Sequence, residues 1–216
     1  MSSWTTETSE RRNLTYILGG RYADGIVLVG DRRVTRGIGG YVYEDKIFSD
    51  VTNVVIAASG IVGVFDKFRK QISAVASKNP NIEAGDFIAE AERIVHKLNQ
   101  EYYERARGGI DLLVAYGRMY RGELQYVTPR GVGEVVRHCQ AIGSGEPYGT
   151  YLLKKLYKDD LTMTQAAALG SAIIEHIEEN ELDQAVGVGK GKPQIWYVPD
   201  WPAGTQYDKL SGEDQK

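Results

Sequence analysis

Three short segments in the first sixty residues place polar groups beside apolar runs. They are Gly30-Asp-Arg-Arg-Val-Thr35, Glu44-Asp-Lys-Ile-Phe48 and Ala57-Ala-Ser-Gly60. Taken singly, each has a structural interpretation, with Asp31 in a surface ion pair and Lys46 as a solvated residue at a sheet edge. A carboxylate, an ammonium group and an unhindered backbone N–H are also group types that acyl transfer uses. Because the three segments occur together and in this order, they indicate a site that could carry out a reaction.

Other catalytic signatures are absent from the sequence. It contains no Gly-x-x-x-x-Gly-Lys-Ser/Thr, no His-Glu-x-x-His and no Gly-x-Ser-x-Gly. Gly187-Val-Gly-Lys-Gly191 is flanked by strand patterns and lacks a following helix, which favours a β-turn over a phosphate loop. Metal catalysis is not expected, because the three histidines are isolated: His96, His138 and His176. No other cofactor is expected either.

The elements that would position these segments begin with strands. A β-hairpin is expected at residues 14–21 and 25–31, joined by the turn signal Tyr22-Ala-Asp-Gly25. Further strand patterns and then two helical patterns follow, the helices separated by a break at Asn79-Pro80-Asn81. These strands cover 41–43, 46–48 and 53–59, and the helices cover 61–75 and 87 to about 107.

The second half repeats this order. Short alternating runs predict an antiparallel meander, and two helices follow, the second with Thr162 as its N-cap. The meander covers 111–116, 123–127 and 133–137, the helices 152–156 and 163–177, and the closing strands 183–188 and 194–198. Hairpin-length connections favour antiparallel pairing, so we expect an α+β fold with two antiparallel sheets between two helical layers.

Composition narrows the class of protein. The chain has 216 residues, 42% hydrophobic and 25% charged, with a net charge of -3, as expected for one globular domain. Cys139 is the single cysteine, which excludes an intrachain disulfide and a cysteine-based zinc site and favours the cytoplasm. The uncharged run from Val51 to Phe65 is shorter than a membrane span, and the basic residues are dispersed. Neither a membrane nor nucleic acid is expected as a partner.

The order and spacing of these motifs resemble the β-type subunits of the proteasome and related N-terminal-nucleophile hydrolases. The similarity covers residues 14–198, and it includes Leu14-Thr-Tyr-Ile17, Ile142-Gly-Ser-Gly-Glu-Pro147 and the late run Asp183-Gln-Ala-Val-Gly-Val188. No helical extension of the α type precedes the first strand pattern. The resemblance implies a four-layer αββα sandwich. It also implies a division into an N-terminal extension or propeptide (1–14), the domain itself (15–198) and a polar tail (199–216).

The resemblance also assigns roles to individual residues. Thr15 corresponds to the nucleophilic N-terminal threonine at the start of the first strand, and Asp31 and Lys46 correspond to the acid and the base-tuning lysine. Gly60 corresponds to the glycine that holds the oxyanion, and Ser144 corresponds to a serine near the nucleophile. Thr35 and Ala58 correspond to residues that contact the substrate. Ser144 has an alternative interpretation as a helix N-cap, and Thr15 alone is typical of a strand.

The implied activity is that of a threonine-type peptidase or amidohydrolase without a cofactor. Its nucleophile would be freed by removal of residues 1–14, and its partners would be a peptide or protein substrate and the other subunits of a homo-oligomeric ring. Two other interpretations stay open: a transpeptidase that uses the same site, and a non-catalytic structural or assembly subunit. Leu14 stands where the family has glycine, and the segment Glu178-Glu-Asn-Glu-Leu-Asp183 lacks the family's Asp-x-x-Ser serine. Both departures favour the non-catalytic interpretation.

Overall fold

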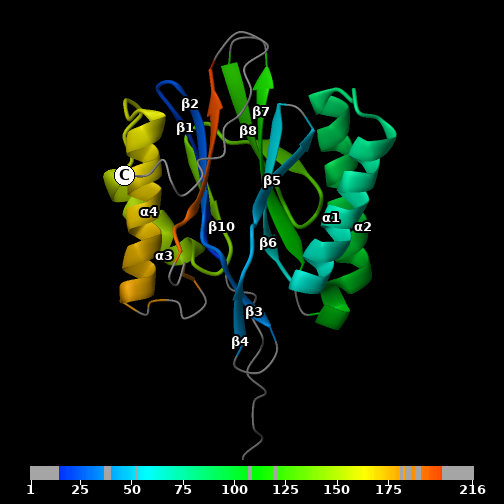
Figure 1. Cartoon of the computed structure of the whole chain (residues 1–216), viewed down its shortest axis with the longest axis horizontal. Helices are drawn as coiled ribbons and strands as arrows, with labels where there is room; N and C mark the ends of the chain where they lie inside the picture. Colours follow the sequence, from blue (N-terminus) through cyan, green and yellow to red (C-terminus); the bar gives the residue numbers. More distant parts are fainter. Residues whose placement is uncertain are drawn as a thin grey trace, which may run out of the picture.

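Two antiparallel sheets lie face to face, and a pair of helices covers the outer side of each, as Figure 1 shows. The computed structural model describes residues 15–36, 40–51, 53–106, 109–118, 121–180, 182, 186–187 and 191–200. The expected four-layer sandwich is confirmed. Residues 1–14 and 201–216 lie outside the described residues, so the predicted division at 14/15 and 198/199 stays a prediction.

The first sheet has the strand order β10-β1-β2-β11. The two central strands form the expected hairpin, in which Ile17 pairs with Gly30 and Tyr22 with Gly25. Both faces of this sheet are covered, so its central strands are apolar at nearly every position. The strands are β1 (Ile17–Tyr22), β2 (Gly25–Gly30), β10 (Cys139–Ile142) and β11 (Gln194–Pro199).

The second sheet has the order β5-β6-β7-β8-β9, and β3 and β4 pair separately as a hairpin. The predicted meander is confirmed as β7, β8 and β9, which pair antiparallel in sequence order. The sheet contains β5 (Ile47–Val51), β6 (Val54–Gly60), β7 (Ile110–Arg118), β8 (Arg121–Val127) and β9 (Gly133–Val135). The separate hairpin contains β3 (Arg33–Arg36) and β4 (Gly40–Tyr43).

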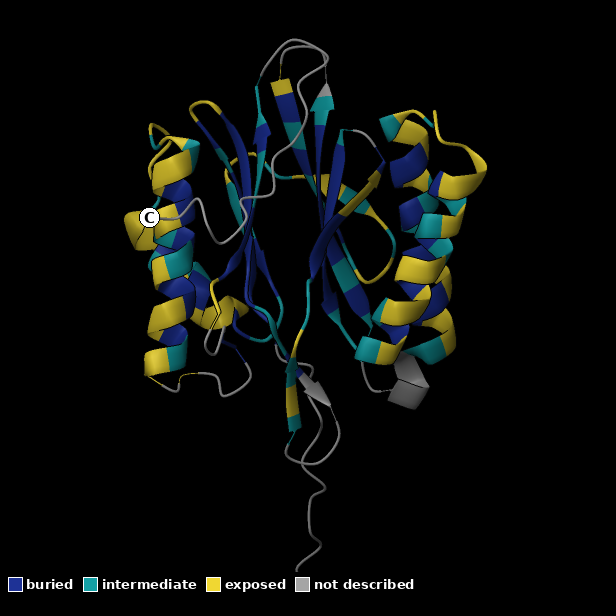
Figure 2. Cartoon of the chain, in the orientation of Figure 1, coloured by how far each residue is buried: buried dark blue, intermediate teal, exposed yellow. Residues whose placement is uncertain are grey.

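Each helical pair buries one apolar stripe against its own sheet, as the buried faces in Figure 2 show. The first pair packs on the five-stranded sheet and the second pair on the four-stranded sheet. A third apolar core fills the space between the sheets. The helices are α1 (Val62–Lys78), α2 (Ala84–Ala106), α3 (Glu146–Leu156) and α4 (Met163–Glu179). Among the described residues, no helix has the length and apolar composition for a membrane crossing.

Local signals account for most of the elements, while one helix start, two short strands and one late strand differ clearly from expectation. Thr162 caps α4 as predicted, because its hydroxyl accepts from the Gln165 N–H in a capping box. The third helix begins at Glu146 rather than at residue 152, with a proline in its first turn. The short strands β3 and β10 were not expected. The late strand predicted at 183–188 is wrong at Val186 and Gly187, which are irregular, and the rest of it lies outside the described residues.

Candidate active site

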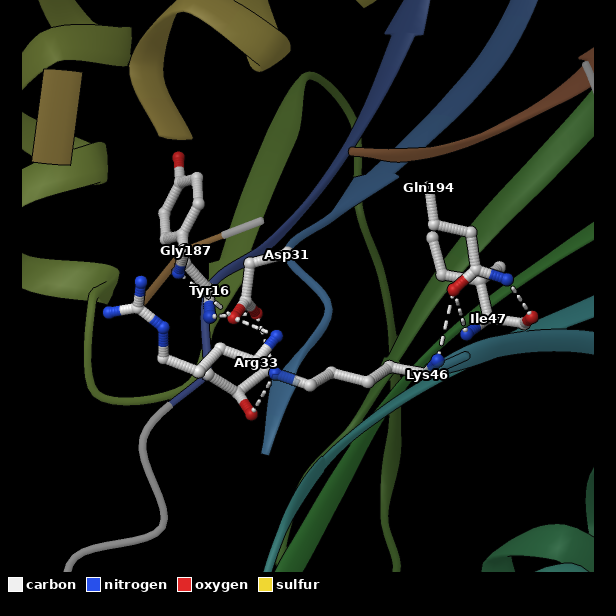
Figure 3. A network of polar contacts seen from close by, with 8 residues as sticks. Tyr16, Asp31, Arg33, Lys46, Ile47, Gly187 and Gln194 are labelled. Atoms are coloured by element: carbon white, nitrogen blue, oxygen red, sulfur yellow. Dashed lines mark hydrogen bonds and ion pairs between the residues drawn. The ribbon is translucent and has the colours of Figure 1, made fainter. Parts of the chain in front are cut away.

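Three residues from separate strand ends form one buried polar chain. Thr15 precedes β1, Asp31 follows β2 and Lys46 precedes β5. The Lys46 ammonium donates to the Thr15 hydroxyl oxygen at 2.9 Å and to Asp31 Oδ1 at 2.7 Å. The three residues are 5%, 0% and 5% exposed, and Figure 3 shows Lys46 extending from its strand toward Asp31. The structure therefore brings together three of the residues that the sequence analysis singled out.

Backbone N–H groups hold the Asp31 carboxylate in place. Oδ1 accepts from Tyr16 N at 2.9 Å, and Oδ2 accepts from Arg33 N at 3.2 Å and from Gly187 N at 3.3 Å (Figure 3). Burial raises the pKa of Asp31, while the Lys46 ammonium and these N–H donors lower it. Because both oxygens accept hydrogen bonds from fixed donors, the geometry matches an ionised carboxylate paired with a charged lysine.

The main chain around Lys46 is held by Gln194, the first residue of β11. The Gln194 amide oxygen accepts from Lys46 N at 2.9 Å and from Ile47 N at 3.0 Å. Its amide nitrogen donates to the Ile47 carbonyl, as Figure 3 shows. Gln194 also pairs with Gly30, the residue before Asp31. One buried glutamine therefore aligns the two strands that carry the cation and the anion.

The turn before α3 packs against the Thr15 carbonyl. Gly145 N donates to the Thr15 carbonyl oxygen at 3.2 Å. Gly143 has φ +97°, and a β-carbon there would lie 2.1 Å from the same oxygen, so glycine is required. Ser144 is half-buried between them. The alternative assignment of Ser144 as the N-cap is wrong, because the cap residue is Gly145 and no side chain caps the helix.

The remaining predicted site residues lie on β6 and β3. Gly60 ends β6 with φ +133°, and a β-carbon there would lie 2.2 Å from the Gly109 carbonyl oxygen. Ala58, two residues earlier, donates its N–H to the Lys46 carbonyl at 3.0 Å and is buried against α1 and α2. Thr35 lies in β3 opposite Tyr41; its side chain is outside the described part. The roles of these residues in binding and catalysis stay predictions.

Sequence comparison identifies the family to which this architecture belongs. The proteasome subunit family model matches residues 13–189. The chain belongs to the proteasome subunit family. The expected resemblance is confirmed, and the family includes subunits named alpha as well as beta among its curated relatives.

Proteasome subunits from bacteria and archaea are among the similar proteins. Proteasome subunit beta 2 from Thermomonospora curvata is 28% identical over 167 residues, which are 72% of this chain and 58% of that protein. This chain therefore matches less than two thirds of that relative. Proteasome subunit alpha from Methanococcus maripaludis is 27% identical over 84% of this chain and 73% of its own length. The solved structure of Anbu (ancestral beta-subunit) from Yersinia bercovieri has the same fold, with TM-score 0.74 and 14% identity over 92% of this chain and 88% of Anbu.

The departures from the proteasome pattern concern Leu14 and the segment that ends at Asp183. Leu14 and Asp183 are outside the described residues. Val186, three residues after Asp183, is 0% exposed. The next residue, Gly187, donates its N–H to Asp31. An apolar side chain therefore adjoins the residue that contacts Asp31.

A second carboxyl group lies at the same end of the sandwich. Asp111 pairs with Ser59 across β6 and β7, and Ser59 Oγ borders Gly143. Burial, followed by repulsion from Glu146, raises the pKa of Asp111 to about 7, and hydrogen bonding from Tyr126 lowers it in part. The sequence analysis missed this group, because Asp111 appeared only as the first residue of a strand.

The arrangement supplies a hydroxyl, a fixed cation and a fixed anion. A lysine ammonium within hydrogen-bond distance of a threonine hydroxyl lowers the pKa of nearby amines and stabilises developing negative charge. Within the described residues, no group of three or more histidine, cysteine, aspartate or glutamate side chains is placed to hold a metal ion. The hydroxyl of Thr15, the ammonium group of Lys46 and the carboxylate of Asp31 are groups of the kinds that acid–base and nucleophilic chemistry uses.

The sequence analysis also missed the residues that support the polar chain. Gln194 and Gly187 bond to Lys46 and Asp31 from positions far along the chain, and Tyr16 bonds to Asp31 through its main chain. Gln194 carried one available signal, since it is a polar residue that opens the otherwise apolar run Gln194-Ile-Trp-Tyr-Val198. Gly187 offered no such signal, because it contacts Asp31 through its backbone N–H, which nearly every residue type has.

Proposed function

We propose that this chain is a threonine-type peptidase or amidohydrolase of the proteasome family. The observation that carries the proposal is the Lys46 ammonium, which donates to the Thr15 hydroxyl at 2.9 Å while paired with the buried Asp31 carboxylate. The interpretation of Lys46 as a solvated edge residue does not fit a side chain that is 6% exposed. A buried lysine that contacts a hydroxyl is better explained by chemistry than by surface solvation.

The reaction begins when residues 1–14 are removed and Thr15 gains a free α-amine. The hydroxyl oxygen attacks the substrate carbonyl carbon, and its proton passes to that amine. Lys46 keeps the pKa of the amine low, and Asp31 keeps Lys46 charged and oriented. The Gly60 N–H stabilises the tetrahedral oxyanion by about 3 kcal/mol.

Collapse of the tetrahedral intermediate breaks the C–N bond, and the leaving amine takes the proton from the Thr15 α-amine. Water then attacks the acyl ester, which releases a carboxylic acid and regenerates the hydroxyl. An amine in place of water would give a transpeptidase from the same intermediate.

Maturation tests the proposal directly. The wild-type chain should lose residues 1–14, and Thr15→Ala should retain them, because the Thr15 hydroxyl must attack the preceding carbonyl. Intact-mass spectrometry of both purified proteins measures the difference. A wild-type chain that stays full-length under active conditions would contradict self-activation.

Lys46→Ala separates catalysis from processing when it is made in a chain that starts at Thr15. Loss of the ammonium group should slow peptide hydrolysis by on the order of 100-fold or more, because the Thr15 amine then becomes protonated. Steady-state kinetics with a peptide substrate gives the ratio, with circular dichroism as the control for folding. Normal turnover by this variant would remove Lys46 from the mechanism.

A second candidate function is a non-catalytic structural or assembly subunit. It is favoured by Leu14 before Thr15 and by the segment Glu178-Glu-Asn-Glu-Leu-Asp183, which lacks the family's Asp-x-x-Ser serine. Both functions predict assembly, since family members present helical faces to neighbouring subunits. Light scattering at micromolar concentration should detect an oligomer, and a stable monomer would argue against a proteasome-like chamber. The intact mass separates the two functions, because an acylated Thr15 has no amine base.

A further inference from the structure

The side chain that follows the nucleophile is buried against α3. Tyr16 is 0% exposed and lies on the helical side of the four-stranded sheet. Its N–H donates to the Asp31 carboxylate at 2.9 Å, and its carbonyl accepts from Asp31 N at 3.0 Å. The main chain of Tyr16 is thus bonded to the anion of the site, while its ring extends away from that site toward the helix.

Two glycines on one face of α3 make room for this ring. A β-carbon at Gly149 would lie 2.0 Å from Tyr16 Cε2 and 2.2 Å from both Cζ and the hydroxyl oxygen. A β-carbon at Gly145 would lie 2.9 Å from Tyr16 Cβ. The two glycines are four residues apart, so they lie on the same side of the helix. The ring therefore rests directly on the backbone of α3.

The same helical turn also holds the main chain of the nucleophile. The Gly145 N–H donates to the Thr15 carbonyl at 3.2 Å, and Gly143 packs against that carbonyl. The first turn of α3 thus contacts Thr15 through its backbone and Tyr16 through the ring. A shift of this helix relative to β1 would move the Thr15 hydroxyl relative to Lys46.

We propose that Gly145 and Gly149 form a slot for the Tyr16 ring, and that this slot positions the Thr15 hydroxyl against the Lys46 ammonium. Tyr16 is a positioning residue, since it acts through Thr15 and α3. The ring and not its hydroxyl does this work, because the buried Tyr16 hydroxyl has no hydrogen-bond partner among the described residues. The effect on turnover rests on the proposed function, whereas the effect on geometry does not.

Gly149→Ala is the central variant. Its new methyl group would collide with the Tyr16 ring, so β1 and α3 must separate. Crystal structures of the full chain should show the distance from Thr15 Oγ1 to Lys46 Nζ lengthening from 2.9 Å to beyond hydrogen-bond reach, about 3.5 Å. In the matured protein, kcat should fall by about 10- to 100-fold with KM nearly unchanged, as expected for a misplaced nucleophile.

Other helical glycines supply matched controls. Gly170→Ala on α4 also creates a tight contact, 2.8 Å from Val29 Cγ2, but against β2 and not against Tyr16. Gly63→Ala on α1 meets nothing within 4 Å. Both variants should keep the Thr15–Lys46 distance and kcat at wild-type values. A loss of kcat in Gly170→Ala as large as that in Gly149→Ala would overturn the proposal, since any core strain would then suffice.

Two substitutions of Tyr16 complete the test and cover the case in which Gly149→Ala fails to fold. Tyr16→Phe should keep kcat within about twofold of wild type. Tyr16→Leu should lower kcat, and the double variant Tyr16→Leu, Gly149→Ala should have a higher kcat than Gly149→Ala, close to that of Tyr16→Leu, or fold where Gly149→Ala does not. Leucine lacks the ring atoms that the new methyl group would meet, so the two changes should be strongly non-additive.

The outcomes separate the two proposals. A wild-type protein that hydrolyses no peptide overturns the proposed function, and the crystallographic distance still tests the slot. A folded Gly149→Ala protein with an unchanged Thr15–Lys46 distance overturns the slot. A folded Tyr16→Leu protein with wild-type geometry and turnover does so as well.

Discussion

Two ion pairs lie near opposite ends of β1. Near its start, Lys46 and Asp31 have side chains that are 6% and 0% exposed, and the pair contacts the Thr15 hydroxyl. At its other end, Arg21 and Asp200 have side chains that are 13% and 19% exposed. Both pairs join segments that are distant in sequence.

The two pairs differ in where their hydrogen bonds end. Arg21 donates to the Gly122 carbonyl and Asp200 accepts from the Gly122 N–H at 2.6 Å, so this pair fastens the four-stranded sheet to β8 of the other sheet. The Lys46–Asp31 pair instead ends on the side chain of Thr15. A buried pair costs desolvation in either place. The Arg21–Asp200 pair aligns the two sheets, whereas the Lys46–Asp31 pair holds the Thr15 hydroxyl, a group that can react.

Removing the anion of the site should have the largest effect. Asp31→Ala leaves the Lys46 ammonium buried without its partner and three backbone N–H groups without their acceptor, so the free energy of unfolding should fall by about 3–5 kcal/mol. Urea denaturation measures it. Hydrolysis should be lost as well. A fall below about 1 kcal/mol would mean that the pair is more solvated than its burial indicates.

Asp200→Ala tests the other pair and should have a smaller effect. The arginine is partly exposed and can be hydrated after the change, so a loss of about 1–3 kcal/mol is expected for hydrogen bonds to a charged group. Hydrolysis by the folded protein should stay within about twofold of wild type, and peptide kinetics below the unfolding transition checks this. A large drop in kcat would show that sheet alignment at this end also sets the site.

Asp111→Asn tests a third acidic residue. Asp31 and Asp200 each pair with a cation, whereas the charged neighbour of Asp111 is another acid, Glu146. The pKa of Asp111 rises from 3.8 to about 7 on folding, so the folded state binds more protons between these values. The free energy of unfolding should therefore decrease as pH rises from about 4 to about 7, and Asp111→Asn should flatten part of that decrease. Urea titrations of both proteins at pH 5 and pH 8 measure the difference. Equal slopes would contradict the raised pKa.

Much of this fold could be predicted from the sequence because its elements are long and strongly patterned. The β1–β2 hairpin has two nearly continuous apolar runs and a Gly-containing turn, and α4 has periodic apolar residues after a capping threonine. The start of α3 could not be predicted because residues 146–151 have little apolar periodicity. They pack through Gly149, which has no apolar side chain and so adds nothing to a helical pattern. The short strands β3 and β10 gain their structure from pairing partners rather than from their own residues.

The candidate site likewise contains residues that could be predicted from the sequence and residues that could not. Thr15, Asp31 and Lys46 could be singled out because motif order fixed their positions, and the structure joins them by hydrogen bonds. The groups that hold these three residues in place could not be identified from the sequence. The Gly187 N–H and the Tyr16 slot depend on backbone direction and on the packing of one element against another, which residue types do not encode locally.

The Gln194 clamp has a consequence for the order in which the protein is made. Lys46 and its clamp are 148 residues apart, and chains are synthesised from the N-terminus, so the hydroxyl, the carboxylate and the ammonium group all leave the ribosome long before the residue that aligns them. A nascent chain that ends before β11 carries every proposed reacting group and lacks the strand that sets their register. We therefore expect the main chain at Lys46 and Ile47 to lack its hydrogen-bonded register against Asp31 until β11 has been synthesised.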